Sequence, residues 1–194
     1  LSREDLARLR QVTASQGLML ESIRDDLVAH QGSPTKAPEQ RLRVLRDAGE
    51  LKIPFTTGIL VGIGEERADR ITALAAIADI HARHGHVQEV IVQNFRAKPD
   101  TAMRAATDTP LEEHLAAVAV TRLLLGPRMR LQAPPNLVGD EFALMLRAGI
   151  DDLRSLLERD YRPEGSTSFG LAGLQSLSTA ELLESVCKAA NALT

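Results

Sequence analysis

Short, mostly continuous apolar stretches alternate along the chain with segments whose apolar residues recur at helical spacing. Together these two patterns predict the strands and helices. Four short stretches are mainly apolar, as buried strands are, and the third is also rich in valine and isoleucine; they cover residues 17–21, 53–62, 87–95 and 129–136. The segments around them carry apolar residues at intervals of three and four, with capping residues or glycine at their ends, as amphipathic helices do. These predicted helices cover residues 2–16, 38–49, 66–84, 110–125 and 139–148.

This strict alternation of strands and helices predicts an α/β fold with a parallel sheet covered by helices. Each strand is separated from the next by the length of one strand–helix unit. Open doubly wound sheets and closed barrels both satisfy the pattern. Four units would make about half of an eight-unit barrel, for which ~250 residues is typical.

Polar side chains gather where each predicted strand ends. In a parallel sheet the carboxyl ends of the strands form the ligand-binding edge. Any one of these residues is most simply a solvated loop start, but their presence at four independent strand ends favours a binding site. The residues are Glu21, Ser22, Glu65, Gln93, Asn94, Gln132 and Asn136.

The second predicted strand ends in an unusual stretch, TTGILVGIGEE, at residues 56–66. Glycine weakens a strand interior, so its repeated use indicates that another group approaches the backbone closely. The stretch fails the GxGxxG pattern because position 67 is Arg, and no Lys-Ser or Lys-Thr pair of a P-loop follows it. Glu65 and Glu66 suit a helix N-terminus and would repel a phosphate there, so a neutral or cationic ligand is expected. The alternative is a tight strand-to-helix turn, made by the glycines and capped by the acids.

Composition narrows the class of protein. The chain has 194 residues, a net charge of −3, no basic block and 3% aromatic residues, so no nucleic-acid partner is expected. No apolar run reaches the length of a membrane span and no signal peptide is recognisable, so no membrane partner is expected either. The single cysteine, Cys187, predicts a reducing, cytoplasmic setting and no cysteine-based metal site within this chain. Since residue 1 is Leu, not Met, and stands directly at a predicted helix, the chain is expected to begin partway through a longer protein or to have been trimmed.

Gly58, Leu60, Gly62 and Glu65 form the pattern GxIxGxxE, with Leu in place of Ile. This pattern resembles the strand-five signature of radical S-adenosylmethionine (SAM) enzymes. Longer stretches are more specific and together resemble the FO synthase family, in its CofG-type subunit or domain, over roughly residues 15–152. The stretches are HQGSPTKAP, LKIPFTTGILVGIGE, GHVQEVIVQNFRAKPDTAM, RLQAPPNL and ALMLRAGIDD.

The resemblance implies a parallel strand–helix barrel of the TIM type, of which this chain would be the C-terminal part. In the family, SAM is reduced at a [4Fe-4S] cluster to give a 5′-deoxyadenosyl radical. That radical starts closure of a hydroxybenzyl-ribitylaminouracil adduct into the deazaflavin FO, a precursor of coenzyme F420, with loss of ammonia. The implied ligands are therefore SAM and a small-molecule substrate. The implied protein partner is a CofH-type radical-SAM subunit or fused domain.

The resemblance also assigns roles to residues. Gly58, Leu60, Gly62 and Glu65 match the motif on the adenosine side of SAM, where the glycines would let the nucleoside lie close to the backbone. Glu21 ends the strand whose counterpart contacts the ribose or methionine end of SAM. A role in the substrate pocket is implied for the QNF-x-x-KP-x-T stretch and the loop after the first strand; these residues are Gln93, Asn94, Lys98, Thr101, His30 and Lys36.

Two features depart from the family pattern. The CxxxCxxC motif that holds the cluster is absent from this sequence. Because each iron that SAM does not bind needs its own thiolate, this chain alone is expected to be inactive. Residues 153–194 do not continue the family's sequence either. We therefore expect two parts, a portion of a radical-SAM barrel at 1–152 and a divergent helical tail at 153–194.

Two other functions stay open. One is a non-catalytic remnant that binds SAM or a partner chain. The other is a fusion in which the tail acts as a carrier module, with Ser176 in GLQSLSTAEL bearing phosphopantetheine, although a helix N-cap explains Ser176 more simply. Part of a barrel would also expose sheet edges, so self-association or poor solubility is expected.

Overall fold

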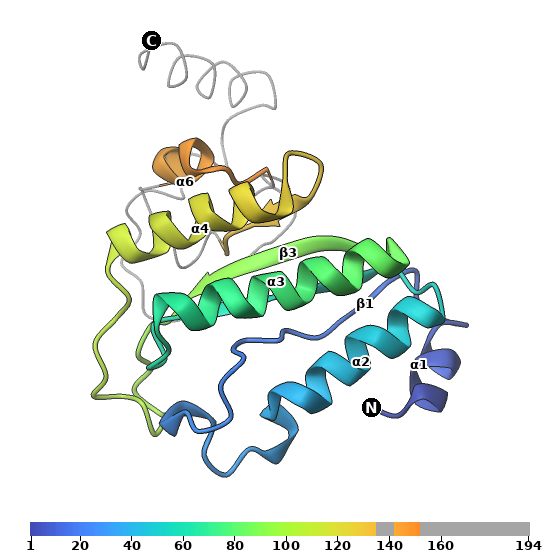
Figure 1. The fold of residues 1–194 in the computed structure, drawn as a ribbon. Helices are drawn as coiled ribbons and strands as arrows, with labels where there is room; N and C mark the ends of the chain where they lie inside the picture. The colour runs from blue at the N-terminus through green and yellow to red at the C-terminus, as the bar shows by residue number, and fades with distance from the viewer. Residues whose placement is uncertain (135–141, 152–194) are drawn as a thin grey trace, which may run out of the picture.

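The fold is described by a computed structural model for residues 1–134 and 142–151 (Figure 1). Its helices are α1 (Arg3–Leu9), α2 (Pro38–Glu50), α3 (Arg67–His84), α4 (Leu111–Leu125) and α6 (Phe142–Ala148), with short 3-10 turns η1 (Val28–His30) and η2 (Pro34–Lys36). Its strands are β1 (Gln16–Gly17), β2 (Phe55–Val61), β3 (Val87–Asn94) and β4 (Arg130–Gln132). The predictions for Asn136, Ser176, Cys187, the tail and the boundary at 152/153 lie outside the described residues.

The strands form one parallel sheet in the order β1-β2-β3-β4. β2 and β3 pair over most of their length, with Thr57 opposite Val90 and Val61 opposite Asn94. This confirms the predicted α/β class and the parallel sheet. The described strands make an open sheet, so closure into a barrel stays a prediction.

Element boundaries differ from the prediction mainly near the N-terminus. The helix expected over 2–16 ends at Leu9. There the Thr13 hydroxyl donates to the Leu9 carbonyl at 2.9 Å and Arg10 donates to the Thr13 carbonyl at 3.0 Å. Such local side-chain bonds compete with the helical pattern. The strand expected over 17–21 is shorter too, because pairing with β2 stops at Gly17 and resumes only as a single bridge from Glu21 to Ile59.

The core lies between the sheet and the layer formed by α2, α3 and α4, which run along one face of it (Figure 1). Alternate residues of β3, such as Val90 and Val92, are fully buried against side chains that include Leu45, Leu74 and Val118. Burial at this level is worth roughly 1.5–3 kcal/mol for each large aliphatic side chain. The packed layer therefore fixes the ends of β2 and β3, from which the loops of the candidate site emerge.

The other face of the sheet is made of polar and half-buried residues in register. Thr56, Glu89 and Arg130 form one row across β2, β3 and β4. The next row places Ile91 between Gly58 and Gln132. None of α2, α3 and α4 covers this face.

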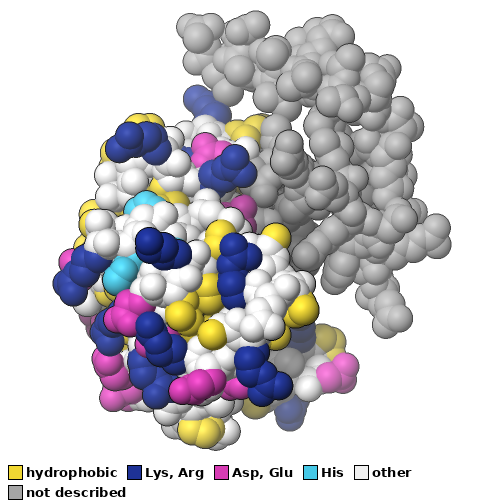
Figure 2. Space-filling model, turned by 90° about the vertical axis from the view of Figure 1, so that its right-hand side faces the viewer, with side chains coloured by type: hydrophobic (Ala, Val, Ile, Leu, Met, Phe, Trp, Pro, Cys, Tyr) yellow, Lys and Arg dark blue, Asp and Glu magenta, His cyan; other side chains and the backbone are white. Residues whose placement is uncertain are grey.

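The end of the sheet at which β3 begins has a mixed surface. α3 ends at His84, three residues before β3, and from this side Lys and Arg side chains are interspersed with Asp and Glu (Figure 2). Among the described residues, no helix has the length and apolar character needed to cross a membrane.

Candidate functional site

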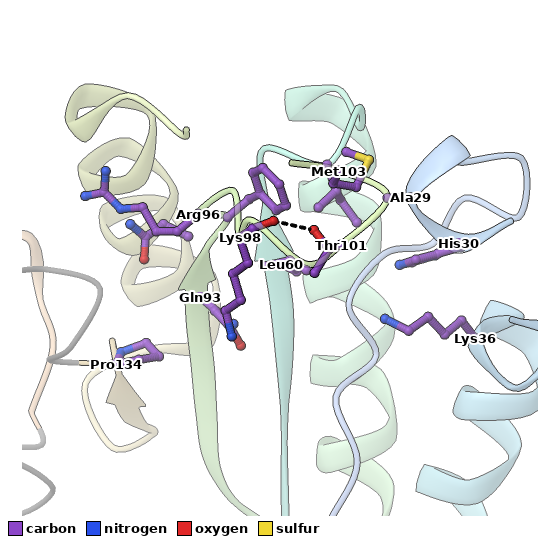
Figure 3. A pocket seen from close by; sticks show the side chains of 13 residues that line it. Ala29, His30, Lys36, Leu60, Gln93, Arg96, Lys98, Thr101, Met103 and Pro134 are labelled. Carbon is purple, nitrogen blue, oxygen red and sulfur yellow. Dashed lines mark hydrogen bonds between the residues drawn. The ribbon is translucent and has the colours of Figure 1, made fainter. Parts of the chain in front are cut away.

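An open cleft of about 380 Å³ lies at the carboxyl ends of β2 and β3 (Figure 3). Its wall comes from four separate segments: the loop before α2, the end of β2, the end of β3 with the loop that follows, and Pro134 after β4. Seven residues singled out in the sequence line it: His30, Lys36, Leu60, Gln93, Asn94, Lys98 and Thr101. The structure therefore brings together the residues predicted for the substrate pocket, whereas Glu21, Gly58, Gly62 and Glu65 do not line the cleft.

Glu65 is turned inward, away from the cleft. Its carboxylate accepts the backbone N–H groups of Gly62 and Ile63, both at 2.8 Å, and the Nε–H of Arg70 at 2.6 Å. The side chain is 1% exposed. Because these contacts are made with the β2–α3 turn and with the first turns of α3, the structure gives Glu65 the role of organising the β2–α3 turn. A direct contact with SAM remains a prediction.

The glycines of the same stretch are explained by neighbouring protein groups. A Cβ on Gly58 would lie 2.0 Å from the carbonyl oxygen of Ile91 on β3. A Cβ on Gly62, whose φ is +95°, would lie 2.1 Å from the Thr109 hydroxyl. The glycines predicted that another group approaches the backbone closely. At both positions that group belongs to this chain: the Ile91 carbonyl at Gly58 and the Thr109 hydroxyl at Gly62. Gly64, at φ +106°, has only Leu27 nearby and serves the turn geometry.

Glu21 is the centre of a cluster beside the cleft. Its Oε2 lies 2.9 Å from His30 Nε2 and 2.7 Å from Lys36 Nζ, while its Oε1 accepts from Arg41 at 3.1 Å. The backbone at Glu21 adopts φ +63°, rare for a residue with a side chain, and is held there by hydrogen bonds in both directions with β2. Glu21 thus fixes two residues of the cleft wall, His30 and Lys36, rather than facing the cleft itself.

The cluster keeps Glu21 ionised. Burial alone would raise the pKa of its carboxyl, but the hydrogen bond from Lys36 and the positive charges of Arg41, Lys36 and His30 outweigh burial and lower the pKa. Two permanent cations face this one carboxylate, so the cluster leaves a net positive charge beside the cleft.

Sequence reasoning missed Arg41, which is 7% exposed. Its guanidinium also donates to the carbonyl oxygens of Met19 and Thr35, so it ties α2 to the chain on both sides of the loop. The signal was present in the helical pattern, since Arg41 falls among the buried positions Pro38, Leu42 and Leu45 of α2. A charged residue on the apolar face of a helix requires a buried partner.

The charges around the cleft also change the expected ligand. His30, Lys36, Arg96 and Lys98 line it, and no acidic residue is among its described lining residues. In Figure 3 the side chains of Lys36 and Lys98 point into the space between the loops. The expectation of a neutral or cationic ligand rested on Glu65 and Glu66, but Glu65 is paired with Arg70 away from the cleft. The cleft suits a ligand with at least one anionic or hydrogen-bond-accepting group.

Comparison with known proteins gives a consistent family. No protein-family model matches the chain. The FO synthase of Mycobacterium tuberculosis (strain ATCC 25618 / H37Rv) is 56% identical over 158 residues, which cover 78% of this chain and 18% of that protein. The 7,8-didemethyl-8-hydroxy-5-deazariboflavin synthase of Archaeoglobus fulgidus is 50% identical over 153 residues, or 79% of this chain and 47% of that protein. This chain is homologous to part of FO synthase.

The FO synthase of Streptomyces coelicolor extends the same relationship, at 50% identity over 153 residues, 76% of this chain and 18% of that protein. The resemblance inferred from the sequence motifs is therefore confirmed. The chain spans less than half the length of each of these relatives.

The donor groups of this chain do not fit an iron–sulfur cluster. Three thiolates would be needed to hold a [4Fe-4S] cluster that leaves one iron for SAM. The sequence contains one cysteine, and the described residues hold no group of three or more His, Cys, Asp or Glu side chains placed to bind a metal. The chain therefore offers no ligand set of its own for the cluster.

Proposed function

We propose that this chain supplies part of the SAM and substrate site of an FO synthase. The reaction is formation of the deazaflavin FO from a hydroxybenzyl-ribitylaminouracil adduct with loss of ammonia, by radical SAM chemistry. One observation carries the proposal: residues of three motifs shared in pattern with FO synthase converge on one cleft. They come from HQGSPTKAP, the GILVG strand and the QNFRAKPDT segment.

The cleft fits a nucleoside-bearing small molecule. Its volume lies within the range of about 300–1,000 Å³ that is usual for ligand pockets. Leu60, Ile63, Phe95 and Met103 give it apolar surface on which a base can pack, and amides and cations supply the polar contacts. SAM, when bound and reduced, supplies the radical that starts ring closure. The residues of this chain bind and orient: Lys98 meets an accepting group of the ligand, and the Glu21 cluster holds Lys36 and His30 at the rim.

Cluster chemistry has to come from outside this chain. The single cysteine favours a second candidate, in which the chain is a non-catalytic SAM-binding part whose face works with a partner, such as a CofH-type radical-SAM subunit or domain. Both candidates require SAM binding and differ in whether cysteines supplied by another chain or segment restore FO formation. We therefore test binding first.

The test is calorimetric titration of the purified chain with SAM. We expect saturable binding, weakened about tenfold by Lys98→Ala, which corresponds to ~1.4 kcal/mol for a lost charge-assisted contact. Among the described residues Lys98 forms no ion pair, so its truncation leaves intact the ion pairs that Lys36 and Arg96 make at the cleft wall. Arg43→Ala is the matched control, because it removes one exposed positive charge on α2. Absence of saturable binding by the wild-type chain would refute the proposal.

A further inference from the structure

One loop contributes a large part of the cleft wall. It connects β3 to α4 and runs from Phe95 to Thr109, and its residues Phe95, Arg96, Lys98, Thr101 and Met103 line the cleft (Figure 3). Within the loop, the Thr101 hydroxyl donates to the Lys98 carbonyl at 2.9 Å, closing a small turn that presents the Lys98 side chain. The position of this turn depends on how the loop is attached at its two ends.

Both ends meet at a single side chain, Thr109. Its hydroxyl donates to the Val61 carbonyl, the last of β2, at 2.7 Å and accepts the Phe95 N–H at 3.0 Å. The Phe95 N–H is shared with the same Val61 carbonyl at 2.8 Å, and the Thr109 N–H donates to the Phe95 carbonyl at 3.1 Å. One hydroxyl therefore joins the carboxyl ends of β2 and β3 to the far end of the loop.

The Thr109 side chain fits at this junction because position 62 is glycine. Thr109 is 5% exposed and its hydroxyl occupies the space in which a Cβ of Gly62 would stand. A residue with a side chain at position 62 would displace Thr109 in addition to straining the backbone at φ +95°. Gly62 and Thr109 are thus complementary across 47 residues of sequence, and neither needs a ligand to account for it.

The neighbouring Asp108 strengthens the same attachment. Its Oδ1 accepts the Ala97 N–H at 2.8 Å and its Oδ2 accepts from Arg96 at 3.2 Å. These bonds lower the pKa of the Asp108 carboxyl, the Ala97 bond most strongly. Thr109 fixes the base of the loop to the strands, and Asp108 closes its first turn.

We propose that Thr109 is a positioning residue that sets the height of the Lys98–Thr101 turn over the cleft. The ligand-binding consequence rests on the proposed function, whereas the anchoring of the loop does not. Thr109 lines no part of the cleft and acts through the loop that it holds.

Hydrogen exchange of the free chain tests the anchoring. Thr109→Val keeps the branched shape, but its side chain can neither donate nor accept a hydrogen bond. Amide exchange over residues 96–106 should therefore rise about tenfold, which corresponds to ~1.4 kcal/mol for the loss of both hydroxyl bonds. Thr109→Ser should restore exchange to within about twofold of wild type. The control is Thr72→Val, which removes a comparable 2.9 Å hydroxyl–carbonyl bond on α3 and should leave the loop unchanged.

Unchanged exchange of residues 96–106 in Thr109→Val would overturn the proposal. Should that variant fail to fold, Asp108→Ala must raise exchange in the same segment selectively, and if it does not, the proposal is equally overturned. SAM titration supplies the functional readout: Thr109→Val should weaken binding about fivefold, with recovery in Thr109→Ser. If Thr109→Val raises exchange in the loop but binds SAM as tightly as the wild type, the proposed positioning role is wrong. If no form of the chain binds SAM, the proposed function fails, and the exchange comparison alone decides whether Thr109 anchors the loop.

Discussion

At the scale of single residues, the Glu65 side chain of the GxIxGxxE pattern stabilises the β2–α3 turn. A carboxylate offers two oxygens, and here they satisfy two backbone N–H groups and one arginine. Arg70 in turn reaches Glu113 at 2.9 Å, and hydrogen bonds from Arg67 and Arg70 lower the pKa of Glu113 to about 2. The β2–α3 turn is thus tied to α4 through a chain of charged groups that starts at Glu65.

We predict that Glu65→Gln lowers the free energy of unfolding by about 2–4 kcal/mol, because an amide leaves one buried N–H without an acceptor and Arg70 with a weakened partner. Urea denaturation followed by circular dichroism measures the change. Glu112→Gln is the control, since Glu112 is exposed in the first turn of α4 and its substitution should cost less than about 0.5 kcal/mol. Equal costs for the two variants would contradict a structural role for Glu65.

At the scale of elements, the helices α2, α3 and α4 and the strands β2 and β3 could be predicted because the hydrophobic pattern is a local property of the sequence, whereas the N-terminal helix and strand are shorter than predicted. The roles of the glycines could not be predicted in this way. Gly58 is required because the Ile91 carbonyl on the next strand leaves no room for a Cβ, and Gly62 because the Thr109 hydroxyl leaves none. Only the fold brings these residues together. Likewise, family resemblance indicated His30, Lys36 and Lys98, but Arg41 escaped because its partners, Met19 and Glu21, are about twenty residues away.

The loop between β1 and α2 depends on the charge of Glu21. Its carboxylate holds Lys36, Arg41 and His30, and its lowered pKa means that the folded state favours the ionised form. The resulting stabilisation is present above the ordinary pKa of the group and is lost as the pH falls from about 4.5 through the lowered folded pKa. Acid therefore weakens the attachment of the loop that carries two residues of the cleft wall.

Glu21→Gln should accordingly destabilise the chain by about 2 kcal/mol near neutral pH, with the difference from wild type shrinking toward zero as the pH is lowered below 4. Unfolding free energies from urea titrations at a series of pH values measure both quantities. Glu39→Gln is a suitable control because Glu39 makes an exposed ion pair with Arg46 and should show little dependence. A difference that stayed constant with pH would exclude the ionised Glu21 as its source.

At the scale of the whole molecule, the sheet ends in two short unpaired edges and has one face without covering helices among the described elements. β1 and β4 are the outer strands, two and three residues long. Parallel sheets are normally covered on both faces, and open edges pair with other strands. Ile91, which lies between Gly58 and Gln132, is the apolar centre of the face that α2, α3 and α4 leave open.

We therefore predict that the chain associates with copies of itself through this face. Light scattering coupled to size exclusion should give a mass above the 21.1 kDa of one chain, rising with concentration. Ile91→Lys should shift the protein toward the monomer, because an ammonium group cannot be buried between two copies without a partner. Val12→Lys is the control, since Val12 is 81% exposed and lies outside the sheet. A compact wild-type monomer at every concentration would show that the open face is satisfied within the chain and would refute the association.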